Sequence, residues 1–121
     1  AEMLPHFIAH ADNAANAIGR RIRCLEGRPI STMAECLEQS TLKATDGVMH
    51  HRACTRMLRE SLSHILKEER QLVTAAQHAG DEVTAQCLIA FMQFQEETLW
   101  TLRTSLRRTA FEEQYLSKES A

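Results

Sequence analysis

The chain has 121 residues, of which 44% are hydrophobic and 25% are charged. This size and balance suit one domain with one hydrophobic core and exclude a disordered chain. No apolar run approaches the roughly 18 residues that cross a bilayer, and no signal peptide opens the chain. We therefore expect a cytoplasmic protein with no membrane partner. The chain starts with Ala rather than Met, which we interpret as processing or trimming of its start.

With a net charge of −2, the electrostatic field of the chain as a whole does not attract nucleic acid. The 14 basic residues are nevertheless unusual in kind, because only three of them are Lys. Arginine presents a rigid fork of donors that suits both carboxylates and phosphates. The arginines could therefore form salt bridges between subunits or bind phosphate. The 16 acidic residues favour the salt bridges. The arginines fall in three rows, which are Arg20, Arg21 and Arg23; Arg52, Arg56 and Arg59; and Arg103, Arg107 and Arg108.

Apolar residues recur every three or four positions from Leu4 to Leu25, which predicts an amphipathic helix over residues 3–26. Gly27 is the expected stop. A short helix should follow, capped by Ser31 or Thr32, and end near residue 39. Residues 40–47 are predicted to be a loop.

Two more long helices are predicted over residues 47–79 and from residue 81 or 82 to residue 108 or beyond. Gly80 and Asp81 form the turn between them, so these helices must be antiparallel neighbours. Residues 109–121 form a more polar C-terminal extension that either continues the helix or docks on a neighbour. Strand signals are absent from the sequence.

The predicted fold is an all-α helical bundle, a single domain over residues 1–121, with three long helices and a short connecting helix. Each long helix carries a wide apolar face or two apolar stripes, which require two packing partners. Three long helices cover these faces poorly. We therefore expect a thin core that is completed by an absent N-terminal helix or by association of subunits.

Four cysteines occur without the spacing of a zinc module. They are interpreted as reduced, buried, small hydrophobic residues, and soft-metal or redox chemistry is the alternative. Pairs such as His64 and Glu68, spaced i and i+4, are interpreted as solvated helix surface. The cysteines are Cys24, Cys36, Cys54 and Cys87.

Two blocks of sequence resemble the Dps family of mini-ferritins, within the ferritin-like proteins. Residues 18–27 read Ile-Gly-Arg-Arg-Ile-Arg-Cys-Leu-Glu-Gly, similar to the end of that family's second helix, and a short connecting helix follows as in the family. Residues 81–88 and the Glu-Glu-Thr-Leu-Trp-Thr-Leu-Arg run at 96–103 resemble its last helix. The resemblance covers residues 4–108 and implies that the family's first helix and half of its second either lie upstream of this sequence or were never part of this protein.

The resemblance implies iron binding and storage, protection of DNA against oxidative stress, and a homo-oligomer that ranges from a dimer to a dodecameric cage. Ferroxidase activity, the oxidation of Fe(II) with peroxide, is implied only if metal ligands exist outside the usual motif. DNA is a further implied partner. The C-terminal tail is a poor phosphate binder, because Lys118 stands among Glu112, Glu113 and Glu119.

The iron ligands of the family do not carry over to this sequence. Its later Asp and Glu pair falls on Asn16 and Arg20, and its earlier Asp falls on Pro5. Iron in this site takes carboxylate and imidazole ligands, and a permanently charged guanidinium repels Fe(II). The residues left as candidate metal ligands are His6, His10 and Asp12, and no catalytic residue is assigned. The alternative function is a ferritin-like scaffold that has lost its iron site and acts as a non-enzymatic assembly or interaction protein.

Overall fold

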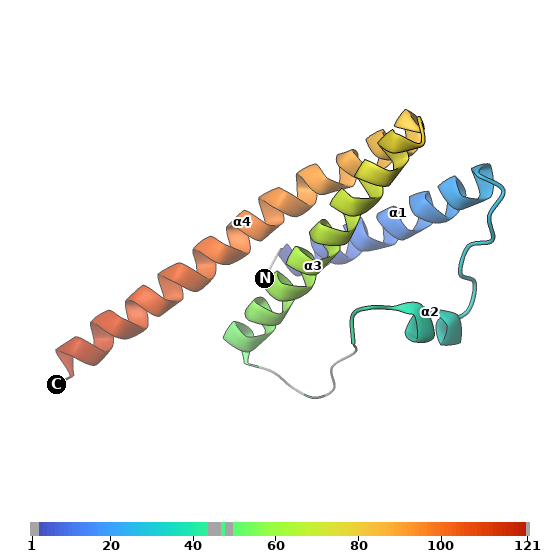
Figure 1. Cartoon of the computed structure of the whole chain (residues 1–121). Coiled ribbons are helices and arrows are strands. Elements are labelled where there is room, and N and C mark those ends of the chain that lie inside the picture. The colour runs from blue at the N-terminus through green and yellow to red at the C-terminus, as the bar shows by residue number, and fades with distance from the viewer. Residues whose placement is uncertain (1–2, 44–46, 48–49, 121) are drawn as a thin grey trace.

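The computed structural model describes residues 3–43, residue 47 and residues 50–120, and this part of the chain contains four helices and no strand. The helices are α1 (Met3–Cys24), α2 (Met33–Gln39), α3 (His51–His78) and α4 (Glu82–Glu119). Figure 1 shows α1, α3 and α4 as long rods, with α4 reaching well past the others toward the C-terminus. The all-α prediction is confirmed. None of the described helices has the length and apolar character to span a lipid bilayer.

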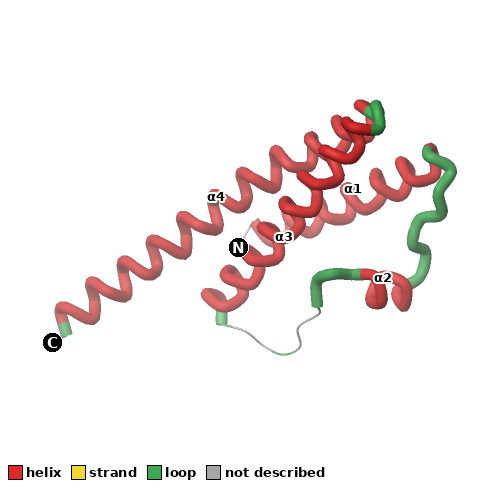
Figure 2. The backbone as a smooth tube through the Cα atoms, in the orientation of Figure 1, coloured by secondary structure: helices red, strands yellow, loops and turns green. Residues whose placement is uncertain are grey.

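The turn between α3 and α4 brings these helices together as an antiparallel pair. Gly80 has a φ of +74°, a backbone conformation that Gly adopts without the steric penalty of a side chain. The Asp81 amide donates to the carbonyl of Ala76 at 2.8 Å, and the Gly80 amide donates to that of Gln77 at 3.0 Å. These two bonds form a Schellman motif, which ends α3 with its last carbonyls satisfied. The hairpin predicted from Gly80 and Asp81 is therefore present (Figure 2).

Asp81 caps α4 and also ties the turn to α1. Its carboxylate accepts hydrogen bonds from the amide of Thr84, at 3.1 Å, and from the Thr84 hydroxyl. The guanidinium of Arg21 donates to the Thr84 hydroxyl at 2.8 Å and to Asp81 at 3.4 Å. The hydrogen bonds from Thr84, followed by the positive charge of Arg21, lower the pKa of Asp81. One carboxylate thus joins the ends of three helices.

We expect Asp81→Asn to unfold at a lower temperature than the wild type at pH 7, because the amide keeps a cap oxygen but loses the charge that attracts Arg21. A depressed carboxyl pKa stabilises the fold above its ordinary value of 3.8, and this stability is lost as the pH falls through the depressed value. The gap between variant and wild type should therefore close in acid. Thermal unfolding followed by far-UV circular dichroism measures it, with the exposed neighbour Glu82→Gln as control. A gap that stays constant into strong acid would contradict the role of the charge.

The hydrophobic core lies where α3 and α4 pack together and α1 covers one side. It contains Leu62 and Leu66 from α3 and Leu99 and Leu102 from α4, all almost fully buried. Partly buried side chains extend it, and these are Met3, Phe7, Leu58 and Met92. The apolar stripes of the sequence predict this seam, because residues three or four apart share a helix face.

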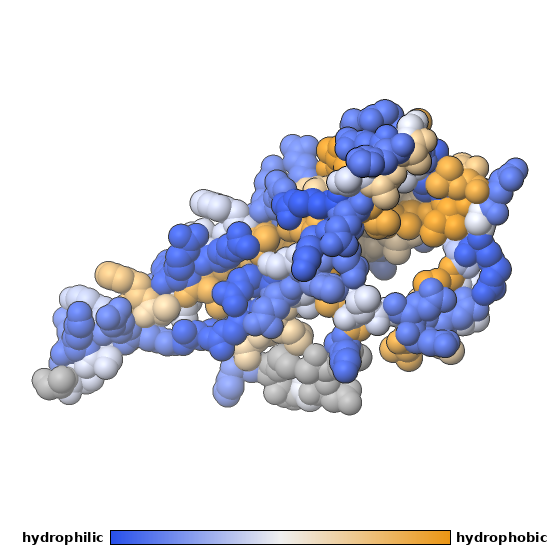
Figure 3. Space-filling model, in the orientation of Figure 1, coloured by the Kyte–Doolittle hydropathy of each residue, from blue (hydrophilic) through white to orange (hydrophobic). Residues whose placement is uncertain are grey.

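Much apolar surface remains uncovered, as the sequence predicts. Within the described part of the chain, 7 apolar residues are buried while 14 large ones are exposed. Figure 3 shows hydrophobic surface where the C-terminal half of α1 approaches the α3–α4 turn. A groove of about 390 Å³ runs there, lined by Ile18, Ile22, Leu72, Ala76 and Leu88 among others. The core of this chain is thin, and the apolar face at this groove lacks a covering element among the described residues.

The end of α1 corrects one sequence prediction. The helix stops at Cys24, and the residue with the left-handed conformation is Glu26 (φ +65°), not Gly27. Gly27 is required for a different reason, because a Cβ there would lie 2.9 Å from the Cγ2 of Ile22. The Gly27 amide donates to the carbonyl of Ile22 at 2.8 Å, and this close return of the chain leaves no room for a side chain.

The short helix α2 begins as predicted, with Thr32 as its cap. The Thr32 hydroxyl accepts from the amide of Glu35 at 3.1 Å, and the carboxylate of Glu35 accepts from the Ser31 amide at 3.2 Å. Figure 1 shows α2 set apart from the long helices, and its Met33 and Leu37 are exposed. A link to α3 comes from the following loop, where Thr41 bonds both His64 and Glu68.

One further helix boundary and one burial prediction differ from what the sequence predicted. The helix α3 starts at His51 with His50 as its cap, four residues later than predicted, and residues 48–49 lie outside the described part. The helix α4 continues through most of the polar extension, to Glu119, which is one of the two outcomes predicted for that extension. The cysteines were predicted to be buried, but Cys24 and Cys36 are exposed and Cys54 and Cys87 are half-buried. Cys24 ends α1 and Cys36 lies on α2, and no helix of the described part of the chain covers either residue.

Candidate functional site

Three polar side chains from three helices meet inside the bundle. His10 comes from α1, Glu69 from α3 and Gln95 from α4. Glu69 is 6% exposed and Gln95 is 4% exposed, so both lie at core positions of their helices. They line a cavity of about 210 Å³ whose other walls are apolar, including Phe7, Ala14 and Leu62.

The amide of Gln95 bridges the other two groups. Its Nε2 donates to the Oε1 of Glu69 at 3.0 Å and lies 3.3 Å from the Nε2 of His10. Because an amide nitrogen only donates, this contact requires an unprotonated Nε2 on His10. The Oε2 of Glu69 and the Oε1 of Gln95 are buried and accept no hydrogen bond from the described residues. The cluster is therefore only partly satisfied by the protein itself.

Burial shifts the pKa values of the two titratable side chains in this cluster, His10 and Glu69, in opposite directions. It lowers the pKa of His10, which favours the neutral imidazole that the contact with Gln95 requires. It raises the pKa of Glu69, against the opposing effects of the Gln95 hydrogen bond and the positive charge of Arg70. His10 is further held between aromatic rings, stacked on Phe94 at 4.4 Å and edge-on to Phe91 at 6.0 Å.

The candidate metal ligands from the sequence are placed apart. His10 points into the cluster, whereas His6 and Asp12 are exposed. Among the residues that the structure describes, no three His, Cys, Asp or Glu side chains are close enough to hold one metal ion. A metal site on His6, His10 and Asp12 stays a prediction, and it requires ligands from outside the described residues.

The buried cluster contains side chains of the kinds that bind iron, but their arrangement does not fit an iron ion. An imidazole and a carboxylate are ligands that iron accepts. The Gln95 N–H, however, occupies the position between them, and a metal ion there would be repelled by the donor hydrogens. The three side chains therefore form hydrogen bonds with one another inside the bundle and do not form a metal site.

Neither Glu69 nor Gln95 was predicted from the sequence as a site residue. The signal was present, because Glu69 continues the spacing of Leu62 and Leu66, and Gln95 falls between Leu88 and Leu99 in the stripe of α4. A polar residue at a core position of an apolar stripe is an informative exception, since burying it requires a partner.

Comparisons with known proteins agree with this architecture. A family model described as ferritin-like domain matches residues 1–111. The chain is 29% identical over 85 residues to the DNA protection during starvation protein of Porphyromonas gingivalis, covering 70% of this chain and 54% of that protein. It is 29% identical over 89 residues to general stress protein 20U of Bacillus subtilis, covering 74% of this chain and 61% of that protein.

Among solved structures, the crystal structure of Dps from Staphylococcus aureus superposes with a TM-score of 0.72 and 25% identity. The match covers 75% of this chain and 61% of that one. The chain thus spans between about half and three fifths of the length of these relatives. The family model covers most of the chain, and the relatives share both sequence and fold with it. The chain therefore belongs to the ferritin-like family, as a Dps-type mini-ferritin.

Proposed function

We propose that this chain is a subunit of a Dps-like assembly that takes Fe(II) as its substrate and protects DNA against oxidative damage. The observation that carries the proposal is the superposition on Staphylococcus aureus Dps, at a TM-score of 0.72 over three quarters of the chain. The names of the two relatives, a DNA protection protein and a general stress protein, support the same role.

We further propose that the functional form is an oligomer. A bundle with an apolar groove of about 390 Å³ and 14 exposed large apolar residues has surface that water covers poorly. Trp100, on α4, is 65% exposed beside Glu96 and Glu97. Exposed aromatic residues with a polar rim are typical of protein interfaces. Contact with neighbouring subunits supplies the second packing partner that the helix stripes require.

Iron would then be bound where subunits meet. The described residues of one chain do not gather three ligand side chains. Asp12 is an exposed carboxylate one helical turn before Asn16, the position that corresponds to a family ligand. Two subunits that bring such faces together can combine carboxylate and imidazole groups that neither holds alone. We propose that Asp12 is one of these ligands.

A non-enzymatic scaffold is the second candidate function. Asn16 and Arg20 stand where the family has two carboxylates, and both are exposed on α1. Neither side chain binds Fe(II) well, and the positive charge of Arg20 opposes it. A chain that keeps the bundle and the interfaces but lacks the ligands would assemble without oxidising iron.

Fe(II) oxidation separates the two candidates. We expect the wild-type protein to oxidise Fe(II) faster than buffer does, with peroxide as oxidant, and Asp12→Ala to lower the rate roughly tenfold or more through loss of a ligand. The rate of Fe(III) formation is followed by absorbance in both cases. Glu38→Ala, which removes an exposed carboxylate from α2, is the matched control and should keep the wild-type rate. A wild-type rate equal to buffer would instead support the scaffold.

A further inference from the structure

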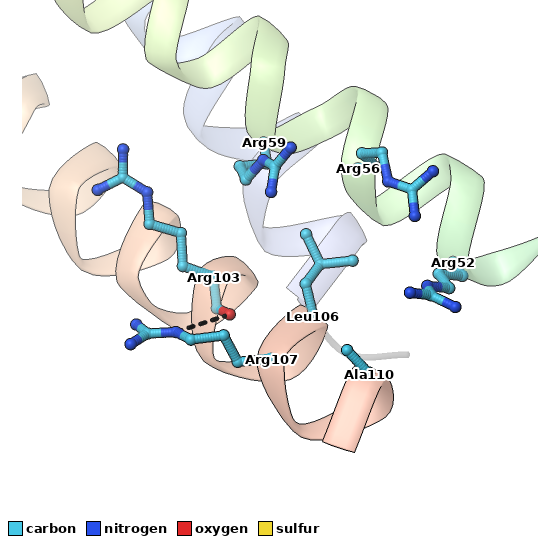
Figure 4. Close-up of a pocket in the computed structure, with 7 residues that line it drawn as sticks. All are labelled: Arg52, Arg56, Arg59, Arg103, Leu106, Arg107 and Ala110. Carbon is cyan, nitrogen blue, oxygen red and sulfur yellow. Dashed lines mark hydrogen bonds between the residues drawn. The ribbon is translucent and has the colours of Figure 1, made fainter. Parts of the chain in front are cut away.

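Five arginines from two helices surround a groove of about 420 Å³. Figure 4 shows Arg52, Arg56 and Arg59 along α3 on one side, and Arg103 and Arg107 along α4 on the other. Each row follows helical spacing, so its side chains emerge on one face. The antiparallel pairing of α3 and α4 then brings the two rows to opposite walls of the same groove. Leu106 lies between the rows and Ala110 completes the lining.

The groove carries more positive charge than the chain neutralises. Arg52 forms an ion pair with Glu113, and Arg59 lies 3.9 Å from Glu60, at the limit of an ion pair. Five guanidinium groups beside two carboxylates leave an excess of three positive charges. Among the described residues, Arg56 and Arg103 have no hydrogen-bond acceptor or carboxylate partner. The protein's net charge of −2 makes this local excess the more unusual.

The donors that remain point to a specific kind of anion. The Nε of Arg52 is buried and has no acceptor among the described residues, although its terminal nitrogen bonds Glu113. The Nε of Arg107 reaches a main-chain carbonyl, that of Arg103, at 3.5 Å, which leaves its terminal nitrogens without a carboxylate. Arginine forks match phosphate oxygens in geometry and charge, and two or more forks around one phosphate group bind it more strongly than a single one.

We propose that this five-arginine groove binds phosphate groups. Two sources share that chemistry, namely the backbone of DNA and free inorganic phosphate or short polyphosphate. The choice of DNA as one source rests on the proposed function, whereas the groove itself is argued from charge and geometry alone. Its apolar floor of Leu106 and Ala110 offers no competing carboxylate, and the two arginine rows run along α3 and α4, so successive phosphates would follow the direction of these helices.

The test uses the assembled protein with two probes, a fluorescent duplex DNA and tripolyphosphate. We expect both to bind, and Arg56→Gln/Arg103→Gln to weaken binding roughly tenfold at low salt. Each lost phosphate contact should also reduce the slope of log affinity against log salt by about one, so the double variant should lose about two. These two arginines are chosen because no described side chain depends on them for an ion pair.

The control is Arg23→Gln/Lys67→Gln, which removes the same two charges from exposed positions outside the groove and should keep the wild-type affinity. Binding of tripolyphosphate alone, or of DNA alone, identifies the source and supports the proposal. Equal losses in both double variants would show a non-specific charge effect and overturn it. The molar mass of the groove variant is measured by light scattering. If the variant changes this mass but still binds both anions as the wild type does, the groove contacts acidic side chains of a second copy, and the proposal is wrong. Fe(II) oxidation, measured in parallel, tests the proposed function separately.

Discussion

Leu66→Ala should lower the free energy of unfolding by about 3 kcal/mol, within the range of roughly 2–5 kcal/mol for removing a buried Leu side chain. Leu66 is 1% exposed and packs in the core with Leu62, Leu99 and Leu102. The large effect has a specific reason here. In a thin core few other apolar contacts exist, so the cavity left by three missing carbons removes a large share of the stabilising contacts.

The measurement is urea unfolding at one fixed subunit concentration, because subunit association also adds to stability. Leu116→Ala is the matched control, since Leu116 is 64% exposed near the end of α4. Its effect should stay within about 0.5 kcal/mol. Similar losses for the two variants would mean that the α3–α4 seam is not where this protein is stabilised.

The helices could be predicted from the sequence because their signals are local. The spacing of apolar residues gives α1, α3 and α4, and the Gly80–Asp81 turn gives the antiparallel pair. Errors arise where a helix end depends on its surroundings. Glu26 takes the positive-φ position of a Schellman motif, in which its amide and that of Gly27 donate to the carbonyls of Arg23 and Ile22, and a prediction from sequence assigns that position to Gly27 because Gly is the usual residue there. The helix α4 runs to Glu119 because its last turns keep good helix formers, although their apolar spacing is weak.

The two candidate sites, the arginine groove and the buried cluster, also differ in how far the sequence predicts them. The two arginine rows were visible in the sequence, and the α3–α4 hairpin alone brings Arg56 and Arg103 to one groove. Glu69 and Gln95 lie at core positions of their helices and meet through the α3–α4 hairpin, but the contact with His10 was not predictable, because it depends on how α1 packs on α4. His10 was singled out for its spacing from His6. Its partners in the structure are instead Gln95 and the ring of Phe94, on another helix.

The cluster of His10, Gln95 and Glu69 gives the protein a pH dependence whose direction follows from its pKa shifts. Glu69 has a raised pKa, so its contribution to stability is complete below the ordinary value of 4.5 and is lost as the pH rises through the raised value. His10 has a lowered pKa, so stability is lost as the pH falls below its ordinary value of 6.5. Gln95 opposes the raised pKa of Glu69, since its amide stabilises the charged carboxylate, whereas on His10 it acts in the same direction as burial, since the same amide favours the neutral imidazole.

Gln95→Leu should therefore destabilise the protein by about 1–3 kcal/mol at pH 7, the penalty for leaving a buried polar group without its donor. The loss should grow as the pH rises above 4.5, because the variant raises the pKa of Glu69 further and the charged form has lost its hydrogen bond. Glu69→Leu/Gln95→Leu should recover most of the loss at pH 7, since removing both partners leaves no unpaired carboxyl. Urea unfolding of both variants at pH 5 and pH 8 measures these differences. A double variant as unstable as the single one would show that Gln95 stabilises the bundle by its shape and not by its bond to Glu69.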